Sequence, residues 1–186
     1  ARPEKGRCMA IAEWPTRSAK ACADYVLFDG LMPVAIVEAK RRRVNIAERI
    51  DQAERYSRDL PVTAPLQLAG IGPAGGPWAD GQGAQFQVPF AYACNGRPWI
   101  KQLAEQSGIW FRDLRSPANL KRPLQQFHTP QGLAELMLRD RELAEQRLST
   151  EPYGYLKLRP YQEDAIAAVE QALASGQRHC LLAMAT

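Results

Sequence analysis

The sequence has few features of a membrane, secreted or zinc-binding protein. It contains no apolar run near the roughly 18 residues that a membrane-spanning helix requires. Its first residues are charged rather than apolar, unlike those of a signal peptide. The four cysteines are scattered and form no Cys-x-x-Cys pair, which argues against a zinc site and a disulfide framework. We therefore expect a cytoplasmic protein with reduced thiols and no membrane partner.

The composition is that of a globular protein rather than a disordered or repetitive chain. Of the 186 residues, 46% are hydrophobic and 24% are charged, which is enough to build a core inside a solvated surface. The formal net charge of +4 is compatible with a nucleic-acid partner but does not require one. The chain starts at Ala1 rather than at methionine and stops directly after the apolar run 180–185, so we expect a piece of a larger protein.

Hydrophobic periodicity and turn residues predict alternating strands and helices, and hence an α/β fold. Strands are expected at 8–14, 23–28, 34–40, 86–94, 98–102, 109–112 and 181–185. Helices are expected from an N-cap at Asn45 to about Arg58, over 131–148, and from 158 to about 174. The Gly- and Pro-rich stretch 66–88 is expected to be a surface loop, and Asn95-Gly96 a tight hairpin turn.

The strands 23–28 and 34–40 are separated by turn residues and together predict a β-hairpin. If it folds about Leu31, the facing pairs are Phe28 with Val34, Val26 with Ile36, and Asp24 with Glu38. Facing residues have Cβ atoms roughly 5 Å apart, and Lys40 is the next residue on the same side because side chains alternate. Two facing carboxylates repel each other, so we expect a cation there. Mg²⁺ is suitable because it binds carboxylate oxygens and keeps waters for a substrate.

Asp24, the thirteen residues after it and the run Glu38-Ala39-Lys40 resemble the PD-(D/E)xK signature of metal-dependent nucleases. The resemblance implies that Asp24, Glu38 and the carbonyl of Ala39 bind metal, and that Lys40 positions or activates the attacking water. Ala23 precedes the aspartate, which is a common variation of the signature. An acid followed by such a run also arises by chance, so a solvated edge hairpin is the alternative interpretation.

Two neighbouring features extend this candidate site. Gln52 and Tyr56 stand four residues apart on the expected helix and so share one face. This spacing resembles the accessory motif that follows the catalytic lysine in type I restriction motor subunits, where both side chains lie beside the active site and DNA. The run Lys40-Arg41-Arg42-Arg43 carries positive charge that suits DNA phosphates. A solvated charge run is the alternative.

The segment from Leu158 onward resembles the entry to a superfamily 2 helicase motor. In that family the glutamine of the Q motif contacts the adenine of ATP. Gln162 matches this glutamine and Arg159 flanks it, so the resemblance implies that both bind nucleotide. The Gly-Lys-Thr that would cradle phosphates is absent from the sequence, and ATP hydrolysis is therefore expected only of a full-length subunit. A plain amphipathic helix followed by a core strand is the alternative.

In this order, the two motifs resemble the motor and restriction subunit of type I restriction endonucleases over almost the whole chain. The implied fold is a restriction-endonuclease-like mixed central sheet flanked by helices over residues 1–115. A linker and connector helix over 116–150 and a truncated RecA-like segment over 151–186 follow. The implied activity is Mg²⁺-dependent hydrolysis of double-stranded DNA, coupled in the full subunit to ATP-driven translocation, with modification and specificity subunits as partners.

Two other functions are compatible with the sequence. One is a DNA-binding module that has the nuclease fold but does not cut DNA. Metal-dependent nicking that requires Glu38 and Lys40 distinguishes that module from a nuclease. The chain would be a nucleotide-binding regulatory fragment if it bound ATP tightly through Gln162, and we expect little or no such binding.

Overall fold

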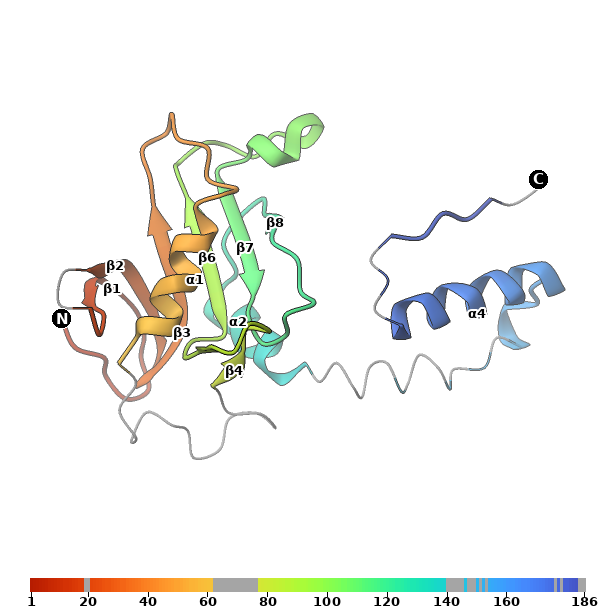
Figure 1. Ribbon diagram of the computed structural model, residues 1–186, viewed down its shortest axis with the longest axis horizontal. Helices are drawn as coiled ribbons and strands as arrows, with labels where there is room; N and C mark the ends of the chain where they lie inside the picture. Colours follow the sequence, from red (N-terminus) through yellow and green to blue (C-terminus); the bar gives the residue numbers. More distant parts are fainter. Residues whose placement is uncertain are drawn as a thin grey trace. The chain divides into compact units, whose positions relative to one another are not determined.

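The computed structural model describes residues 1–18, 21–61, 77–139, 146, 150, 152, 154–175, 177 and 179–183. The chain divides into two compact units, Ala1–Leu138 and Arg139–Thr186 (Figure 1). The first unit continues past residue 115, where the sequence predicted the end of the first domain. It does so because the helix that ends at Leu138 packs on the sheet of this unit.

A mixed sheet of six strands forms the first unit (Figure 1). In pairing order the strands are β1 (Cys8–Pro15), β2 (Cys22–Asp29), β3 (Met32–Ala39), β6 (Phe90–Cys94), β7 (Ile109–Asp113) and β8 (Arg122–Pro123). β3 and β6 run parallel, and each other neighbouring pair runs antiparallel. A mixed sheet with helices confirms the predicted α/β class, and the strands predicted at 8–14, 23–28 and 109–112 are present.

The hairpin of β2 and β3 has the predicted register at the end that carries the acids. Val26 pairs with Ile36, and residue 25 pairs with residue 37 in the same register. The next positions along the two strands are Asp24 and Glu38. The register therefore places Asp24 opposite Glu38, as the sequence predicted.

The register changes near the turn of this hairpin. Phe28 pairs with Pro33, where the sequence predicted Val34, because a bulge lies between Leu27 and Phe28. Proline has no N–H to donate to a neighbouring strand, and a bulge is where a strand accommodates it. The prediction for Phe28 was wrong by one residue, but the shift lies at the opposite end of the hairpin from Asp24.

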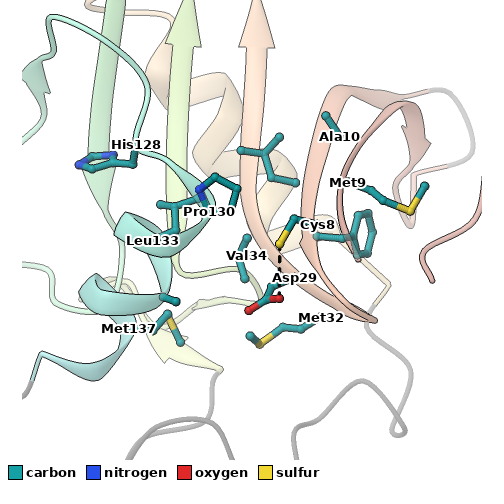
Figure 2. Close-up of a pocket in the computed structure, with 13 residues that line it drawn as sticks. Cys8, Met9, Ala10, Asp29, Met32, Val34, His128, Pro130, Leu133 and Met137 are labelled. Atoms are coloured by element: carbon teal, nitrogen blue, oxygen red, sulfur yellow. Dashed lines mark hydrogen bonds between the residues drawn. The ribbon is translucent and has the colours of Figure 1, made fainter. Parts of the chain in front are cut away.

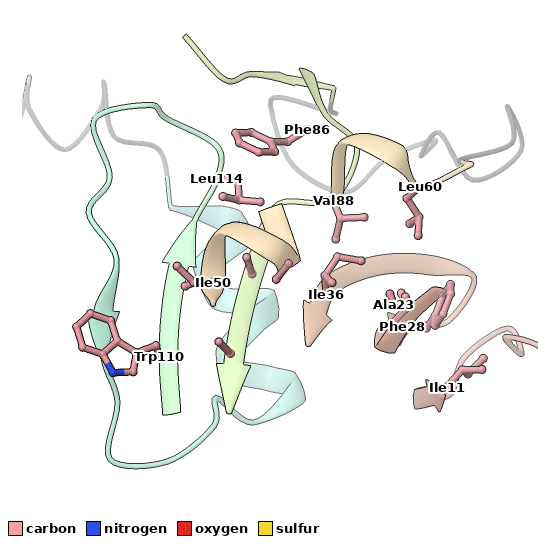
Figure 3. Close-up of a cluster of buried hydrophobic side chains, with 14 of the residues drawn as sticks. Ile11, Ala23, Phe28, Ile36, Ile50, Leu60, Phe86, Val88, Trp110 and Leu114 are labelled. Carbon is pink, nitrogen blue, oxygen red and sulfur yellow. The ribbon is translucent and has the colours of Figure 1, made fainter. Parts of the chain in front are cut away.

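β3 is buried on both faces. Ile36 belongs to one apolar cluster, whereas Ala35 and Val37 belong to a second cluster. Helix α1 (Ile50–Asp59) covers the first cluster, part of which Figure 3 shows, and helix α2 (Pro130–Leu138) covers the second. Each fully buried aliphatic side chain contributes about 1.5–3 kcal/mol. The two helices thus hold β3, and with it Glu38, in the middle of the sheet.

Helix α1 begins later than predicted. The sequence predicted an N-cap at Asn45, but the helix starts at Ile50 after a turn. The Asn45 Oδ1 instead accepts a hydrogen bond from the N–H of Ala47 at 3.2 Å, which favours a local turn over a helix. The C-terminal end agrees with the prediction, since the helix stops just before Leu60 and Pro61.

The chain after α1 differs from the prediction in two ways. The expected strand 86–94 is divided into β5 (Gln85–Phe86), which pairs with β4 (Trp78–Ala79), and β6. The expected return strand 98–102 is absent, because β6 takes β3 and β7 as its neighbours, and η2 (Lys101–Gln106) forms a 3-10 helix there. Residues 66–76 of the expected loop 66–88 lie outside the described residues.

The rest of the first unit is partly as predicted. Short strand β8 lies inside the stretch 116–150 that the sequence predicted as a linker and connector helix. Helix α2 lies at the start of the helix predicted over 131–148 and buries Leu133, Leu136 and Met137. The expected continuation of this helix to residue 148 falls mostly on residues 140–145 and 147–149, which lie outside the described part.

The second unit contains η3 (Gly154–Leu156) and helix α4 (Pro160–Ala174). The helix agrees with the prediction. The strand expected at 181–185 is absent at 181–183, because a strand needs a pairing partner and the described residues of this unit offer none, while 184–186 lie outside them. Among the described residues of both units, no helix is long and apolar enough to span a bilayer.

Candidate active site

Asp24 and Glu38 meet at the end of the β2–β3 hairpin. The Asp24 Oδ2 accepts a hydrogen bond from the backbone N–H of Ala39 at 2.7 Å. Because Ala39 directly follows Glu38, this bond holds the Asp24 carboxyl group beside β3. Glu38 is buried, with 1% of its surface exposed. The two predicted acids are therefore adjacent, as the hairpin register required.

Lys40 completes the cluster. Its Nζ donates a hydrogen bond to the Glu38 Oε1. The second carboxylate oxygen of Glu38, Oε2, is buried and has no hydrogen-bond partner among the described residues. An unsatisfied buried polar group costs about 1–3 kcal/mol, and more when charged. The site thus presents an oxygen that a further positive group could satisfy.

The electrostatics of Glu38 reflect this position. Burial raises the pKa of its carboxyl group above the ordinary value; the hydrogen bond from Lys40 lowers the pKa, and the negative charge of Asp24 raises it. Burial, then Asp24 and Glu38, also raise the pKa of the Cys94 thiol. Both shifts arise because the site concentrates negative charge in a poorly solvated place.

The donor set suits a hard divalent cation. In the described part of the chain, no group of three or more His, Cys, Asp or Glu side chains could hold a metal. Two carboxylates with a neighbouring backbone carbonyl suffice for Mg²⁺, which usually takes one or two carboxylates and keeps several waters. The unsatisfied Glu38 Oε2 fits such an ion. Ala39, the third predicted ligand, is exposed at the end of β3.

The predicted accessory pair lies on α1. The Gln52 Nε2 donates a hydrogen bond to the Tyr56 hydroxyl at 2.9 Å, so the two side chains do share a face. Tyr56 packs against the cluster that contains Ile36. Glu38 lies two residues after Ile36 on β3, so the two side chains point to the same face of the sheet. The pair therefore lies on the side of the sheet toward which Glu38 points.

The basic run follows β3 directly. Arg41, Arg42 and Arg43 are exposed, and the backbone from Arg41 to Val44 forms a turn closed by a hydrogen bond of 2.9 Å. Among the described residues no carboxylate forms an ion pair with these three arginines. Sequence reasoning missed Asn95, which is buried and donates hydrogen bonds to this turn; its dipeptide with Gly96 was interpreted as a hairpin turn.

The predicted nucleotide-binding residues belong to the second unit. The Gln162 Oε1 accepts a hydrogen bond from the backbone N–H of Arg159 at 2.9 Å, which caps the N-terminus of α4. Arg159 is exposed. Capping explains why a glutamine stands at this position, and nucleotide binding by these residues stays a prediction.

An apolar pocket lies at the other end of the hairpin, near its turn and α2 (Figure 2). In it the Cys8 thiol contacts Asp29, and burial followed by the charge of Asp29 raises the pKa of this thiol. None of the predicted site residues is among those that line the pocket. Its mainly apolar lining is unsuited to phosphate, so the Asp24–Glu38 end is the better candidate for chemistry on DNA.

Comparison with known proteins agrees with the sequence resemblance. Residues 1–137 match the family model described as the second domain of the endonuclease subunit of the type I restriction enzyme EcoKI. The chain belongs to this family. The matched range nearly coincides with the first unit, Ala1–Leu138, so the Asp24, Glu38 and Lys40 cluster lies inside the matched domain.

One relative covers the whole chain. The type I restriction enzyme EcoKI endonuclease subunit of Escherichia coli (strain K12) is 39% identical over 203 aligned residues, which include 100% of this chain. The chain spans only 17% of the length of that relative. No solved structure matches the chain. These findings confirm the predicted restriction-endonuclease family, while the nuclease signature and the helicase segment stay predictions.

Proposed function

We propose that this chain carries the nuclease site of a type I restriction endonuclease subunit and hydrolyses phosphodiester bonds of double-stranded DNA with Mg²⁺. The cluster of Asp24, Glu38 and Lys40 supports this most directly, because a buried oxygen of Glu38 lacks a partner among the described residues. The family match supports it independently, since the relative is named an endonuclease subunit.

Asp24, Glu38 and the carbonyl of Ala39 would hold the ion. A bound Mg²⁺ would neutralise charge on a DNA phosphate and make a bound water more acidic. The Asp24 Oδ2 already accepts the Ala39 N–H, so its carboxyl group is oriented before any ion binds. Such preorganisation lowers the cost of assembling the site.

Lys40 would position the attacking water. An ammonium group has three N–H donors, and in the structure Lys40 Nζ donates to Glu38 Oε1. The remaining donors could hold a water and a phosphate oxygen while the bond to Glu38 fixes the side chain. Gln52 and Tyr56 would support Lys40 and the substrate, and Arg41, Arg42 and Arg43 would bind phosphates along the strand.

In a full-length subunit, we propose that cleavage is coupled to ATP-driven translocation along DNA, with Arg159 and Gln162 in the nucleotide site. Modification and specificity subunits would choose the DNA sequence. These parts of the proposal rest on the family and on the helicase resemblance, because this chain spans 17% of its relative.

Nicking of supercoiled plasmid DNA tests the proposal. The wild-type chain should nick in Mg²⁺ and not in EDTA. Glu38→Ala and Lys40→Ala should each lose at least roughly 100-fold of the rate, because acid–base and metal chemistry contribute at this scale. Lys5→Ala and Glu135→Gln change exposed residues outside the site and are the matched controls. Nicking that survives both site variants would reject the assignment.

A DNA-binding module without catalysis is the second candidate. It is favoured by one observation: the described residues bring only two carboxylates to the site, without a third acid, His or Cys close enough to share a metal. Metal-dependent DNA binding without nicking, in a chain that folds cooperatively, would select this candidate over the nuclease.

A further inference from the structure

The turn after Lys40 is held by hydrogen bonds from residues that directly follow the neighbouring strand β6. Its closing hydrogen bond joins the N–H of Val44 to the carbonyl of Arg41, so Arg42 and Arg43 occupy the exposed corner. An isolated turn of this kind would sample many conformations, since ordering each residue costs about 1–2 kcal/mol. The turn here has further hydrogen-bond partners that restrict it.

Asn95 and Arg97, which follow β6, supply those partners. The Asn95 Nδ2 donates to the Val44 carbonyl at 2.8 Å and, more weakly, to the Arg42 carbonyl at 3.5 Å. The Arg97 Nε donates to the same Arg42 carbonyl at 2.7 Å. The Asn95 Oδ1 in turn accepts the N–H of Arg97 at 3.1 Å. Two carbonyls of the basic turn are therefore fixed by two adjoining residues.

The parallel pairing of β3 and β6 makes this arrangement possible. Parallel strands end at the same edge of a sheet, and the N–H of Lys40 donates to the Cys94 carbonyl at 2.7 Å. Gly108 lies against the backbone of Arg97. A Cβ on Gly108 would lie 2.1 Å from the Arg97 carbonyl oxygen. The backbone at Arg97 is thus in close contact with Gly108, which leaves it little room to move.

The arrangement brings Arg97 to the turn that directly follows Lys40 and carries Arg41, Arg42 and Arg43. Arg97 uses Nε to hold the turn, and within the described part of the chain its terminal nitrogens have no hydrogen-bond or ion-pair partner. Asn95 is buried, with 5% exposed, so its amide serves the turn rather than the solvent. Guanidinium groups held by a rigid backbone suit phosphate oxygens, because their planar fork is already oriented.

We infer that Arg97 is a further phosphate-binding residue of the DNA surface beside Lys40, and that Asn95 is the positioning residue that holds Arg41, Arg42 and Arg43 at this surface. The inference rests on the proposed function, because it takes DNA as the partner. Its residues lie outside the metal cluster, so it can fail while the metal site stands.

The experiment measures binding of a short fluorescent DNA duplex by anisotropy over a range of salt concentrations, with Ca²⁺ in place of Mg²⁺. Arg97→Ala should reduce the slope of log affinity against log salt by about 1 and weaken binding roughly fivefold to tenfold near 0.1 M salt. Arg7→Ala removes the same charge next to β1 at the far end of the sheet, where Cys8 pairs with Asp29, and should leave the slope unchanged. Asn95→Ala keeps all four arginines but should also weaken binding.

The outcomes separate the two proposals. Equal effects of Arg97→Ala and Arg7→Ala would overturn the role of Arg97, and wild-type affinity in a cooperatively folded Asn95→Ala would overturn the positioning role. If Asn95→Ala does not fold, Arg97→Lys tests whether side-chain hydrogen bonds to the Arg42 carbonyl position the basic turn. This substitution keeps the positive charge but removes the hydrogen bond from the Arg97 Nε to the Arg42 carbonyl. We therefore expect weaker DNA binding with an unchanged slope of log affinity against log salt. Wild-type affinity of this variant would contradict the inference. No DNA binding by the wild type would overturn the proposed function and this inference together.

Discussion

The carboxyl group of Asp24 accepts a hydrogen bond from the backbone N–H of Ala39 at 2.7 Å. This N–H stands between Glu38 and Lys40 along the chain, so the bond orients Asp24 toward both. A substitution at Asp24 can remove the negative charge of its side chain while keeping the hydrogen bond from Ala39. An amide oxygen could accept the same N–H, whereas it could not replace the negative charge.

Asp24→Asn is expected to keep the fold and lose the metal. Loss of an outer-shell partner alone typically costs 10–100-fold in metal affinity, so loss of a charged ligand should cost at least about that much. Calorimetric titration with Mg²⁺ or Mn²⁺ measures the affinity, and thermal unfolding without metal checks the fold. Asp24→Ala, which also removes the acceptor for Ala39, should lower the unfolding temperature further. Unchanged metal affinity in Asp24→Asn would exclude Asp24 as a ligand.

Metal affinity is expected to rise with pH through the titration of Glu38. Burial raises the pKa of this group above its ordinary value of 4.5, so a proton competes with the ion at every pH below the raised pKa, and the competition therefore persists above pH 4.5. For one displaced proton the affinity changes about tenfold per pH unit below the raised pKa. Titrations at a series of pH values check the slope, and Glu38→Gln should bind weakly at every pH.

The raised pKa of Glu38 also determines how the stability of the metal-free protein changes with pH. The folded protein holds the Glu38 proton more tightly than the unfolded chain does, so the contribution of this group to stability is present at low pH. It is lost as the pH rises through the raised pKa. A metal at 100 times its Kd would restore about 2.7 kcal/mol. Thermal unfolding with and without Mg²⁺ should therefore diverge as the pH increases. Equal curves at neutral pH would argue against metal binding.

Tyr56→Phe removes the hydroxyl that accepts the Gln52 N–H at 2.9 Å. The ring still packs on its cluster, so the loss of unfolding free energy should be about 1 kcal/mol or less. If the pair supports Lys40 and DNA, nicking should fall by more than this stability loss explains. Tyr25→Phe, at an exposed tyrosine on β2, is the control. Equal nicking by both variants would mean that the pair only stabilises α1.

Gly108→Ala is expected to destabilise the chain and loosen the basic turn. The added Cβ would lie 2.1 Å from a backbone oxygen of Arg97, so the backbone must move. Overpacking of this kind costs about 1–3 kcal/mol or more. Gly154→Ala, where the Cβ would meet nothing within 4 Å, is the matched control. Chemical denaturation measures both, and similar curves for the two variants would contradict the close contact.

The sequence by itself determined the β2–β3 hairpin and the contents of its end. Asp24, Glu38 and Lys40 share a side because strand side chains alternate, and the Gln52–Tyr56 pair shares a helical face because of its spacing. These are short-range relations, which a pattern of residues along the chain specifies. The bulge between Leu27 and Phe28, where Phe28 pairs with Pro33, and the late start of α1 were missed because a proline and a local Asn45 hydrogen bond changed the regular geometry.

Only the tertiary structure decided which strands pair across the chain. Asn95-Gly96 has the composition of a hairpin turn, but β6 lies parallel to β3 and the chain continues into η2, so Asn95 holds the turn at Arg42 instead. The residues at 181–183 are apolar, yet form no strand in the described part of their unit. Pairing between distant segments depends on packing of the whole sheet against α1 and α2, which no local pattern encodes.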